Sequence, residues 1–193
     1  MMNDSPKLSH TGTVPLETER LNLRRMSVSD APQMFENWAN DPEVTKFMLW
    51  DAHKGVVASE ERLALWEGQY SEPDFYQWGI EIKETGQLIG TASVVNMRAA
   101  HLSCELGWCI GRRFWNRGIT SEAVAAVIKH LFNNAGFNRI AAHHFADNTA
   151  SGRVMQKTGM TFEGISRQCD YMAKLGGFVD VACYAVCKSD YPK

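Results

Sequence analysis

Residues 112–122 read Arg112-Arg113-Phe114-Trp115-Asn116-Arg117-Gly118-Ile119-Thr120-Ser121-Glu122, a basic turn that contains glycine and leads into an amphipathic helix. The apolar face of that helix follows the spacing i, i+3, i+4 and i+7, and Gly136 is placed as its stop; the face consists of Val124, Val127, Ile128 and Leu131. A strand-like run from Leu102 to Ile110 precedes the turn. Backbone N–H groups from about Arg117 to Ser121 are therefore expected to converge on an anion at the positive end of the helix dipole. This pattern predicts a phosphate site.

The same turn indicates which phosphate ligand to expect. It lacks the lysine-serine pair of a P-loop and the three glycines of a dinucleotide-binding loop. The run from Trp115 to Thr120 resembles the pyrophosphate loop of the GNAT N-acetyltransferase superfamily, Gln/Arg-x-x-Gly-x-Gly/Ala, with Gly118 as the strict match. The form Trp-Asn-x-Gly-x-x-x-Glu-Ala, closed by Glu122, is similar to the RimJ/RimL-type branch, which acetylates protein N-termini and some small amines.

Two further blocks carry the resemblance. Asp147-Asn148-x-Ala150-Ser151, followed by Lys157-x-Gly159-Met160-x-Phe162-x-Gly164, is similar to the Asn-x-x-Ser helix and next strand of that branch. The early run Thr18-Glu19-Arg20-Leu21, with Asn40-Asp41-Pro42-Glu43-Val44, matches a third block. Together the blocks cover residues 17–188 in the family's order, so the resemblance extends over nearly the whole chain.

Composition fits one cytoplasmic domain. At 193 residues, 45% of them hydrophobic, the chain can bury a sizeable core. A net charge of −2 argues against a nucleic-acid or membrane-surface partner. Five cysteines without a Cys-x-x-Cys pair favour a reducing cytosol and indicate no metal site. The polar residues 1–15 are interpreted as a flexible N-terminal arm, and residues 16–193 as a single N-acetyltransferase domain.

Periodicity predicts an α/β (α+β) fold with a mixed, mostly antiparallel sheet and helices on both faces. Helices are expected after Ser29, from Ser59, after Gly118 and over 149–158. The expected strands are Leu21–Arg24, Phe75–Lys83, Leu88–Met97, Leu102–Ile110, Arg139–Phe145, Thr161–Arg167 and Phe178–Lys188, about seven in all. The resemblance implies a GNAT-like fold in which the fourth and fifth strands splay apart and the pantetheine arm of acetyl-CoA lies in the gap. Gly107 is interpreted as a bulge in the fourth strand.

The resemblance implies acetyl-CoA as the acetyl donor and assigns it a set of contacts. A backbone N–H from Trp108, Cys109 or Ile110 is expected to hold the acetyl carbonyl. The expected cofactor-binding residues are Trp108, Cys109, Ile110, Arg112, Arg117, Gly118, Ile119, Thr120, Ser121, Asn148 and Ser151. Arg153 and Lys157 lie at i and i+4 on one helix and could reach the phosphates, although a solvated position is preferred for Lys157.

The candidate catalytic residues are Ser151, Glu105 and Asp170. Ser151 matches the serine that RimL-type enzymes place near the sulfur as general acid. The helix from Thr149 lacks the tyrosine that many other branches use, which favours Ser151 and leaves Tyr171 and Tyr184 as alternatives. Glu105 and Asp170 are the acidic candidates for taking or relaying the amine proton, and Asp170 stands at the position of a glutamate in RimL-like enzymes. Asn148 matches an asparagine that contacts the cofactor arm, and it is also a good N-cap for its helix; both roles can hold at once.

Three other side chains favour structural roles. Adjacent strand residues point to opposite faces, so His143 and His144 cannot both bind one metal ion from that strand, and one buried and one exposed histidine are expected. Cys109 could carry an acetyl group, but no activating partner is visible in the sequence, and a packed thiol is the preferred interpretation.

The acceptor side is predicted in outline only. The family resemblance places the acceptor beside the two early helices, where Phe47, Trp50 and Trp66 are expected to bind it, with Met48 and the acids Glu43 and Asp51 in the same wall. The leading acceptor is a protein N-terminal amine; the alternatives are a small amine, polyamine or aminoglycoside, or a catalytically silent acyl-CoA-binding module. An exposed edge strand near the C-terminus leaves monomer and homodimer open.

Overall fold

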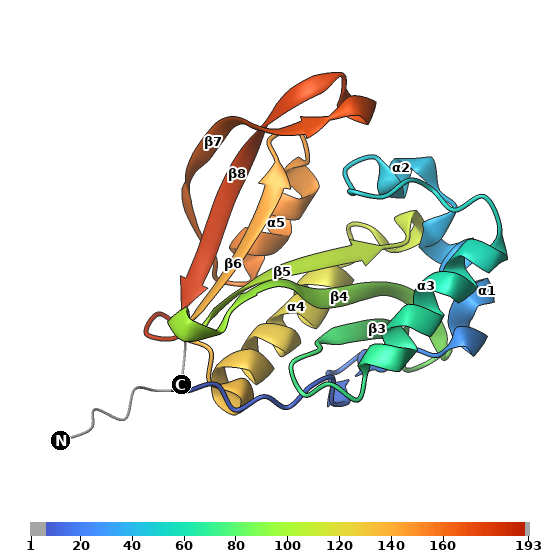
Figure 1. Cartoon of the computed structure of the whole chain (residues 1–193), viewed down its shortest axis with the longest axis horizontal. Helices are drawn as coiled ribbons and strands as arrows, with labels where there is room; N and C mark the ends of the chain where they lie inside the picture. Colours follow the sequence, from blue (N-terminus) through green and yellow to red (C-terminus); the bar gives the residue numbers. More distant parts are fainter. Residues whose placement is uncertain (1–6, 192–193) are drawn as a thin grey trace.

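One mixed sheet of eight strands runs through the domain in the order β1-β2-β3-β4-β5-β6-β8-β7 (Figure 1). It is seen in a computed structural model that describes residues 7–191. The strands are β1 (Leu16–Glu17), β2 (Leu21–Arg24), β3 (Gln77–Ile82), β4 (Gln87–Arg98), β5 (Ser103–Ile110), β6 (Arg139–Phe145), β7 (Thr161–Met172) and β8 (Gly177–Cys187). All neighbouring pairs are antiparallel except β5–β6, which is parallel. The predicted mixed, mostly antiparallel sheet is confirmed, with β1 as an additional short strand.

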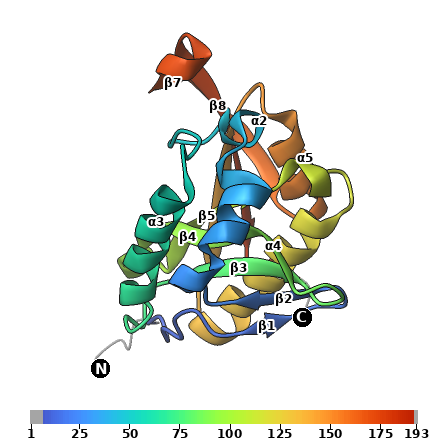
Figure 2. The same ribbon diagram turned by 90° about the vertical axis from the view of Figure 1, so that its right-hand side faces the viewer.

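Helices cover both faces of this sheet, as predicted (Figure 2). They are α1 (Ala31–Met34), α2 (Pro42–Thr45), α3 (Val56–Gln69), α4 (Ile119–His130) and α5 (Thr149–Lys157). Helix α4 continues as a wider π-helical turn, Leu131–Ala135, and stops at Gly136, whose φ is +82°. The predicted stop is therefore correct, because glycine adopts this left-handed conformation without a steric cost from a Cβ.

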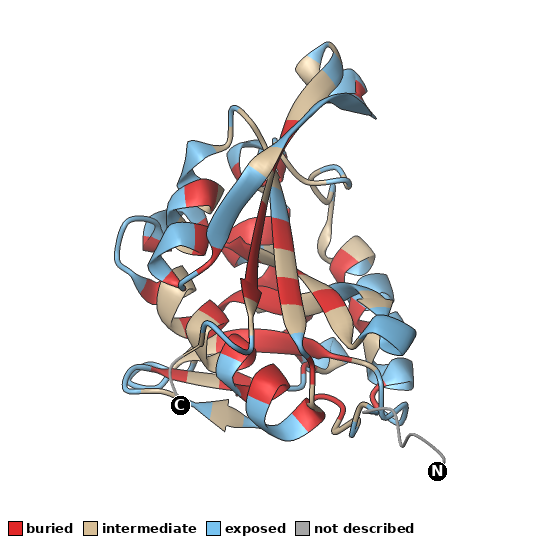
Figure 3. Ribbon diagram, turned by 90° about the vertical axis from the view of Figure 1, so that its left-hand side faces the viewer, coloured by how far each residue is buried: buried red, intermediate tan, exposed pale blue. Residues whose placement is uncertain are grey.

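Alternation along the strands divides the core into two layers. Ile89 and Ile110 join the cluster under α4 and α5, whereas the neighbouring Leu88 and Cys109 join the cluster under α1 and α3. Since successive strand residues point to opposite faces, β4 and β5 contribute to both layers. Figure 3 shows the result, with the central strands buried and much of β7 exposed.

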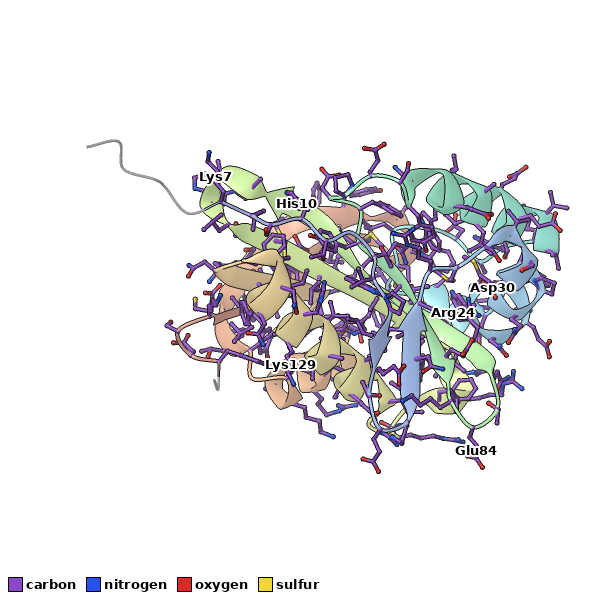
Figure 4. All side chains as sticks on the ribbon, turned by 90° about the horizontal axis from the view of Figure 1, so that it is seen from below. Lys7, His10, Arg24, Asp30, Glu84 and Lys129 are labelled. Atoms are coloured by element: carbon purple, nitrogen blue, oxygen red, sulfur yellow. The ribbon has the colours of Figure 1, made fainter. Side chains whose placement is uncertain are left out.

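The first helical segment begins earlier than Ser29. A short 3₁₀ turn, Val28–Asp30, leads into α1, and the Ser27 N–H donates to the Asp30 carboxylate at 2.9 Å. Arg24, at the end of β2, donates to both oxygens of Asp30 at 2.9 Å (Figure 4). This bidentate pair joins the first long strand to the helix that follows it.

The N-terminal segment corrects one prediction. Residues 1–6 of the expected flexible arm lie outside the described residues, but residues 7–15 lie against the domain (Figure 4). The Ser9 N–H donates to the Ala135 carbonyl at 2.9 Å, and Thr13 is only 1% exposed. The expectation fails for residues 7–15 because their polar groups are hydrogen-bonded to the domain instead of to water.

The sheet opens between β5 and β6. Their parallel pairing covers only three residue pairs and ends at Glu105 and Ala141, although β5 runs on to Ile110 and β6 to Phe145. The predicted splay of the fourth and fifth strands is thus confirmed (Figure 1). The predicted bulge at Gly107 is wrong, because the register shift lies between Val94 and Asn96 on β4.

Within residues 7–191, no helix combines the length and apolar character needed to cross a membrane.

Candidate active site

The turn before α4 has a backbone that few residue types adopt. Asn116 has a φ of +59°, and Gly118, the N-cap of α4, has a φ of +73°. Asparagine and glycine are the residues that enter the left-handed region most readily, which explains their positions in this turn. The first N–H groups of α4 lack intrahelical partners and lie at the positive end of the helix dipole. The turn therefore has the backbone geometry of an anion site.

A half-buried carboxylate connects this turn to the start of the domain. Glu122, in the first turn of α4, accepts from the Thr18 hydroxyl at 2.5 Å and from the Arg20 backbone N–H at 3.0 Å. The Arg20 guanidinium contacts the same carboxylate at 2.6 Å and donates to the Arg117 carbonyl at 3.1 Å. Burial acts to raise the pKa of Glu122, but these hydrogen bonds outweigh it and lower the pKa. The block Thr18–Leu21 and the phosphate-type turn thus form one structural unit.

The edge of β5 directs backbone N–H groups into the split. The Gly111 N–H donates to the Ile89 carbonyl at 2.9 Å, which sets the phase of the β4–β5 ladder. Alternate residues of an antiparallel ladder turn their backbone groups to the same neighbour, so Cys109 faces β4 while Trp108 and Ile110 face the gap. The Ile110 carbonyl accepts from the Trp115 indole at 2.9 Å. The N–H groups of Trp108 and Ile110 are the donors left to meet a ligand in the split.

The opposite wall is the first turn of α5. The Asn148 side chain caps this helix, since its Oδ1 accepts from the Ser151 N–H at 3.4 Å. Ser151 is half-buried. A Cβ on Gly152 would stand 2.7 Å from His144 Nε2, so any other residue would displace the His144 ring where α5 crosses β6. This close approach holds the start of α5 against the end of β6.

These elements surround a cavity of about 420 Å³. Its wall brings together nine of the residues predicted from the sequence: Phe47, Trp108, Cys109, Ile110, Gly118, Thr120, Ser121, Asn148 and Ser151. They come from the α2–α3 loop, β5, the start of α4 and the start of α5. Segments far apart in the chain therefore meet where the sheet opens.

Seven predicted site residues do not line this cavity. Arg112 pairs with Asp41 at 3.1 Å, and the guanidinium of Arg117 lies over the Phe114 ring. Ile119 is buried in the core under α4, because it starts the apolar face of that helix. Trp50 and Trp66 pack against the core under α1 and α3. Glu105 and Asp170 lie on β5 and β7 away from the cavity wall.

The cavity also includes residues that sequence reasoning did not assign to it as binding residues. They are Val44, Lys46, Phe114, Trp115, Asn116, Asp147, Thr149, Ala150, Arg153, Val154 and Lys157; Glu43 and Met48, expected in the acceptor wall, line the cavity as well. The sequence does indicate two of them, because Arg153 and Lys157 are spaced i and i+4 and therefore share one face of α5, the face that borders the cavity. Both are exposed, and both contribute to the wall.

Cys109, His143 and His144 lie in environments that indicate their roles. Cys109 is 6% exposed, and burial raises the pKa of its thiol to about 12. A thiol this hard to ionise is a packing group and a poor nucleophile. His143 is exposed and His144 is half-buried, with a buried Nε2 atom that has no partner among the described residues. Among those residues no group of three or more His, Cys, Asp or Glu side chains is placed to hold a metal ion.

The groups that line the cavity are of the kinds that acetyl-CoA binding requires. The start of α4 offers N–H groups and a position without a Cβ, where a substituent on Gly118 would come within 4 Å only of the Arg20 guanidinium. Arg153 and Lys157 supply positive charge beside it, and β5 supplies N–H donors at the gap. A pyrophosphate, an amide-containing arm and a thioester carbonyl each find groups of the right kind.

Comparisons with known proteins agree with this chemistry. The model for the Acetyltransferase (GNAT) domain matches residues 20–161. The Bacillus subtilis protein "Uncharacterized N-acetyltransferase YoaA" is 34% identical over 173 residues, which cover 90% of this chain and 96% of that protein. The Escherichia coli [Ribosomal protein uS5]-alanine N-acetyltransferase is 24% identical over 189 residues, 95% of each chain.

Solved structures show the same fold. The ribosomal-protein-S5-alanine acetyltransferase from Vibrio fischeri superposes with a TM-score of 0.79 at 21% identity and covers 93% of this chain and 100% of its own. A GNAT-family acetyltransferase from Bacillus anthracis gives a TM-score of 0.79 at 23% identity and covers 91% of this chain and 99% of its own. The chain therefore belongs to the GNAT family of N-acetyltransferases and is an acyltransferase that uses acetyl-CoA as its acetyl donor.

Proposed function

We propose that this enzyme acetylates the N-terminal amine of a protein, as the ribosomal-protein-type members of the family do. The observation that carries the proposal is the similarity to the uS5-alanine N-acetyltransferase, which extends over 95% of both chains and includes the acceptor-side segments. The wall of the cavity supports it, because Phe47 and Met48 supply apolar surface and Glu43 a carboxylate beside the split. A peptide N-terminus combines a cationic amine with a first side chain, and these groups complement such a wall.

The chain's own residues have distinct proposed roles. Acetyl-CoA, when bound, supplies an acyl group activated as a thioester. The N–H groups of Trp108 and Ile110 hold the acetyl carbonyl, and the turn around Gly118 binds the phosphates with Arg153 and Lys157. Ser151 donates a proton to the departing sulfur, and Glu105 and Asp170 are acidic groups that assist the removal of the acceptor's proton.

The test is thiol release from acetyl-CoA, measured with peptides that differ in their first residue. Each peptide has a matched control in which the N-terminus is already acetylated while any lysine stays free. The proposal predicts turnover with the free N-terminus and none with the blocked peptide. A panel of polyamines and amino-sugars runs in parallel, and turnover confined to that panel would replace the protein acceptor with a small amine.

Ser151→Ala provides the check on the chemical role. We expect kcat to fall about 10²-fold, the lower end of what general acid catalysis contributes, while the affinity for acetyl-CoA stays within about twofold of wild type. Equal loss of turnover and affinity would assign Ser151 to cofactor binding instead.

A further inference from the structure

Glu105 and His143 form a hydrogen-bonded pair at the closed end of the split, where β5 and β6 begin to separate. The two atoms Glu105 Oε1 and His143 Nδ1 are 2.8 Å apart, and the other carboxylate oxygen, Oε2, accepts from the Asn96 amide at 2.9 Å. Three adjacent strands, β4, β5 and β6, are thus joined by side chains where the last β5–β6 backbone pair, Glu105 and Ala141, is found. The side chain of His143 is 37% exposed and that of Glu105 is 23% exposed, so solvent reaches the pair.

The pair lies on the acceptor side of the sheet. Glu105 and Cys109 share a strand face, and Cys109 packs in the core under α1 and α3. Helices α4 and α5, which supply the phosphate turn and Ser151, cover the other face. A side chain on the Glu105 face therefore meets the split from the side opposite to the proposed donor site.

Strand geometry places His143 close to the proposed carbonyl site. Glu105 pairs with Ala141, so His143, two residues further along β6, is level with Gly107 on β5. Trp108, whose N–H faces the gap, is one residue beyond, or about 3.3 Å along the strand direction. The imidazole thus lies about one residue short of Trp108 along the strand direction, on the face of the sheet opposite to α4 and α5.

The hydrogen bonds determine which atom is free to react. Both oxygens of Glu105 accept a hydrogen bond, and the bond from His143 lowers the pKa of Glu105, so its carboxylate is a weak base. When His143 donates through Nδ1 to Glu105, the neutral imidazole has its lone pair on Nε2. Glu105 then serves to select the tautomer and to hold the ring.

We propose that His143 takes the proton from the acceptor ammonium, and that Glu105 is its positioning residue. The N–H bond of the ammonium breaks, its electron pair stays on nitrogen for attack on the thioester carbonyl, and the proton passes to Nε2 and then to solvent. The inference rests on acetylation of an amine, as in the proposed function, and holds for a protein or a small-molecule acceptor.

The charges around His143 give the expected pH dependence. The hydrogen bond to Glu105 raises the pKa of His143 above 6.5, with further contributions from the carboxylates Asp170 and Glu163 on β7; Arg139 on β6 pairs with Glu163, and Cys183 lies opposite on β8. The same bond lowers the pKa of Glu105. Since the base must be neutral, kcat is expected to fall below the pKa of His143, so the acidic limb lies above pH 6.5 in the wild type.

The test compares two variants with a control over pH 5.5–9. His143→Asn keeps an amide N–H for Glu105 but removes the titratable nitrogen, and we expect kcat at neutral pH to fall about 10²-fold with acetyl-CoA affinity unchanged. Glu105→Gln removes the charge that raises the pKa of His143, and it is expected to move the acidic limb towards lower pH. His101→Gln, at an exposed histidine in the turn before β5, is the matched control and should behave as wild type.

A purely structural role for the Glu105–His143 pair predicts a different result. If His143→Asn keeps kcat within about threefold and keeps the acidic limb, the pair is a structural link between strands and the proposal is wrong. The assay uses whichever amine the wild-type enzyme acetylates. Turnover of small amines alone would therefore contradict the proposed protein acceptor while leaving this test of His143 intact.

Discussion

At the scale of single residues, Gly118 is the position where the proposed donor site can be tested most specifically. Its φ of +73° and its place at the start of α4 make it the residue next to the proposed pyrophosphate. Asparagine and aspartate have the same shape, and both enter the left-handed region more easily than other residues with a Cβ. They differ in charge, so the pair separates electrostatic effects from steric effects.

We expect Gly118→Asp to weaken acetyl-CoA binding at least about tenfold more than Gly118→Asn, because a carboxylate would repel the phosphates at short range. The measurement is a calorimetric titration of both variants at low and high salt. Screening should narrow the gap between them as the salt concentration rises. Equal affinities of the two variants for acetyl-CoA would contradict the proposal that a phosphate binds at this turn.

At the scale of elements, the start of α5 combines a helix cap with a cavity wall. Asn148→Ala removes the cap and is expected to lower the free energy of unfolding by about 1 kcal/mol. Asn148→Asp keeps an oxygen for the cap but cannot donate a hydrogen bond. If the amide also donates to the cofactor arm, the Asp variant keeps wild-type stability and loses acetyl-CoA affinity, by about tenfold for a lost hydrogen bond.

Thermal unfolding and acetyl-CoA titration of both variants decide between the two roles. A cap alone predicts that Asn148→Asp matches wild type in both measurements. Wild-type affinity in Asn148→Ala, with reduced stability, would lead to the same conclusion.

The elements also show what could be predicted from the sequence. Strand β6 has the predicted bounds, Arg139–Phe145, because its pattern is local. The strand predicted as Thr161–Arg167 instead runs to Met172, since an irregularity between Ser166 and Asp170 interrupts the period of two. Trp66 lies three residues after Leu63 on α3, a spacing that predicts a place on the core face, whereas the family resemblance assigns Trp66 to the acceptor wall. Long-range pairs such as Glu105 and His143 depend on the splay, which no local pattern encodes.

At the scale of the whole molecule, the β7–β8 hairpin and the α2–α3 loop meet across the acceptor side. Lys174, at the tip of the hairpin, donates to the carbonyls of Thr45 and Trp50 at 3.0 and 2.8 Å and lies 3.3 Å from Asp51 Oδ1. Asp51 is 94% exposed, so its ion pair contributes little. The two carbonyls are the stronger link, and they belong to the segment that places Phe47 in the cavity wall.

Lys174→Met is therefore expected to loosen residues 46–55 without opening the core. The two hydrogen bonds from a charged donor are worth about 1–2 kcal/mol together, which corresponds to a rise of about fivefold to thirtyfold in KM for the acceptor. The affinity for acetyl-CoA should stay the same, because the α4 turn and α5 are untouched. Lys129→Met, at an exposed lysine on α4, makes the same change in charge and serves as the control. Steady-state kinetics with both substrates varied, together with limited proteolysis of the loop, measure the two effects. If the KM for the acceptor and the cleavage rate both match those of the control, the hairpin does not position the acceptor wall.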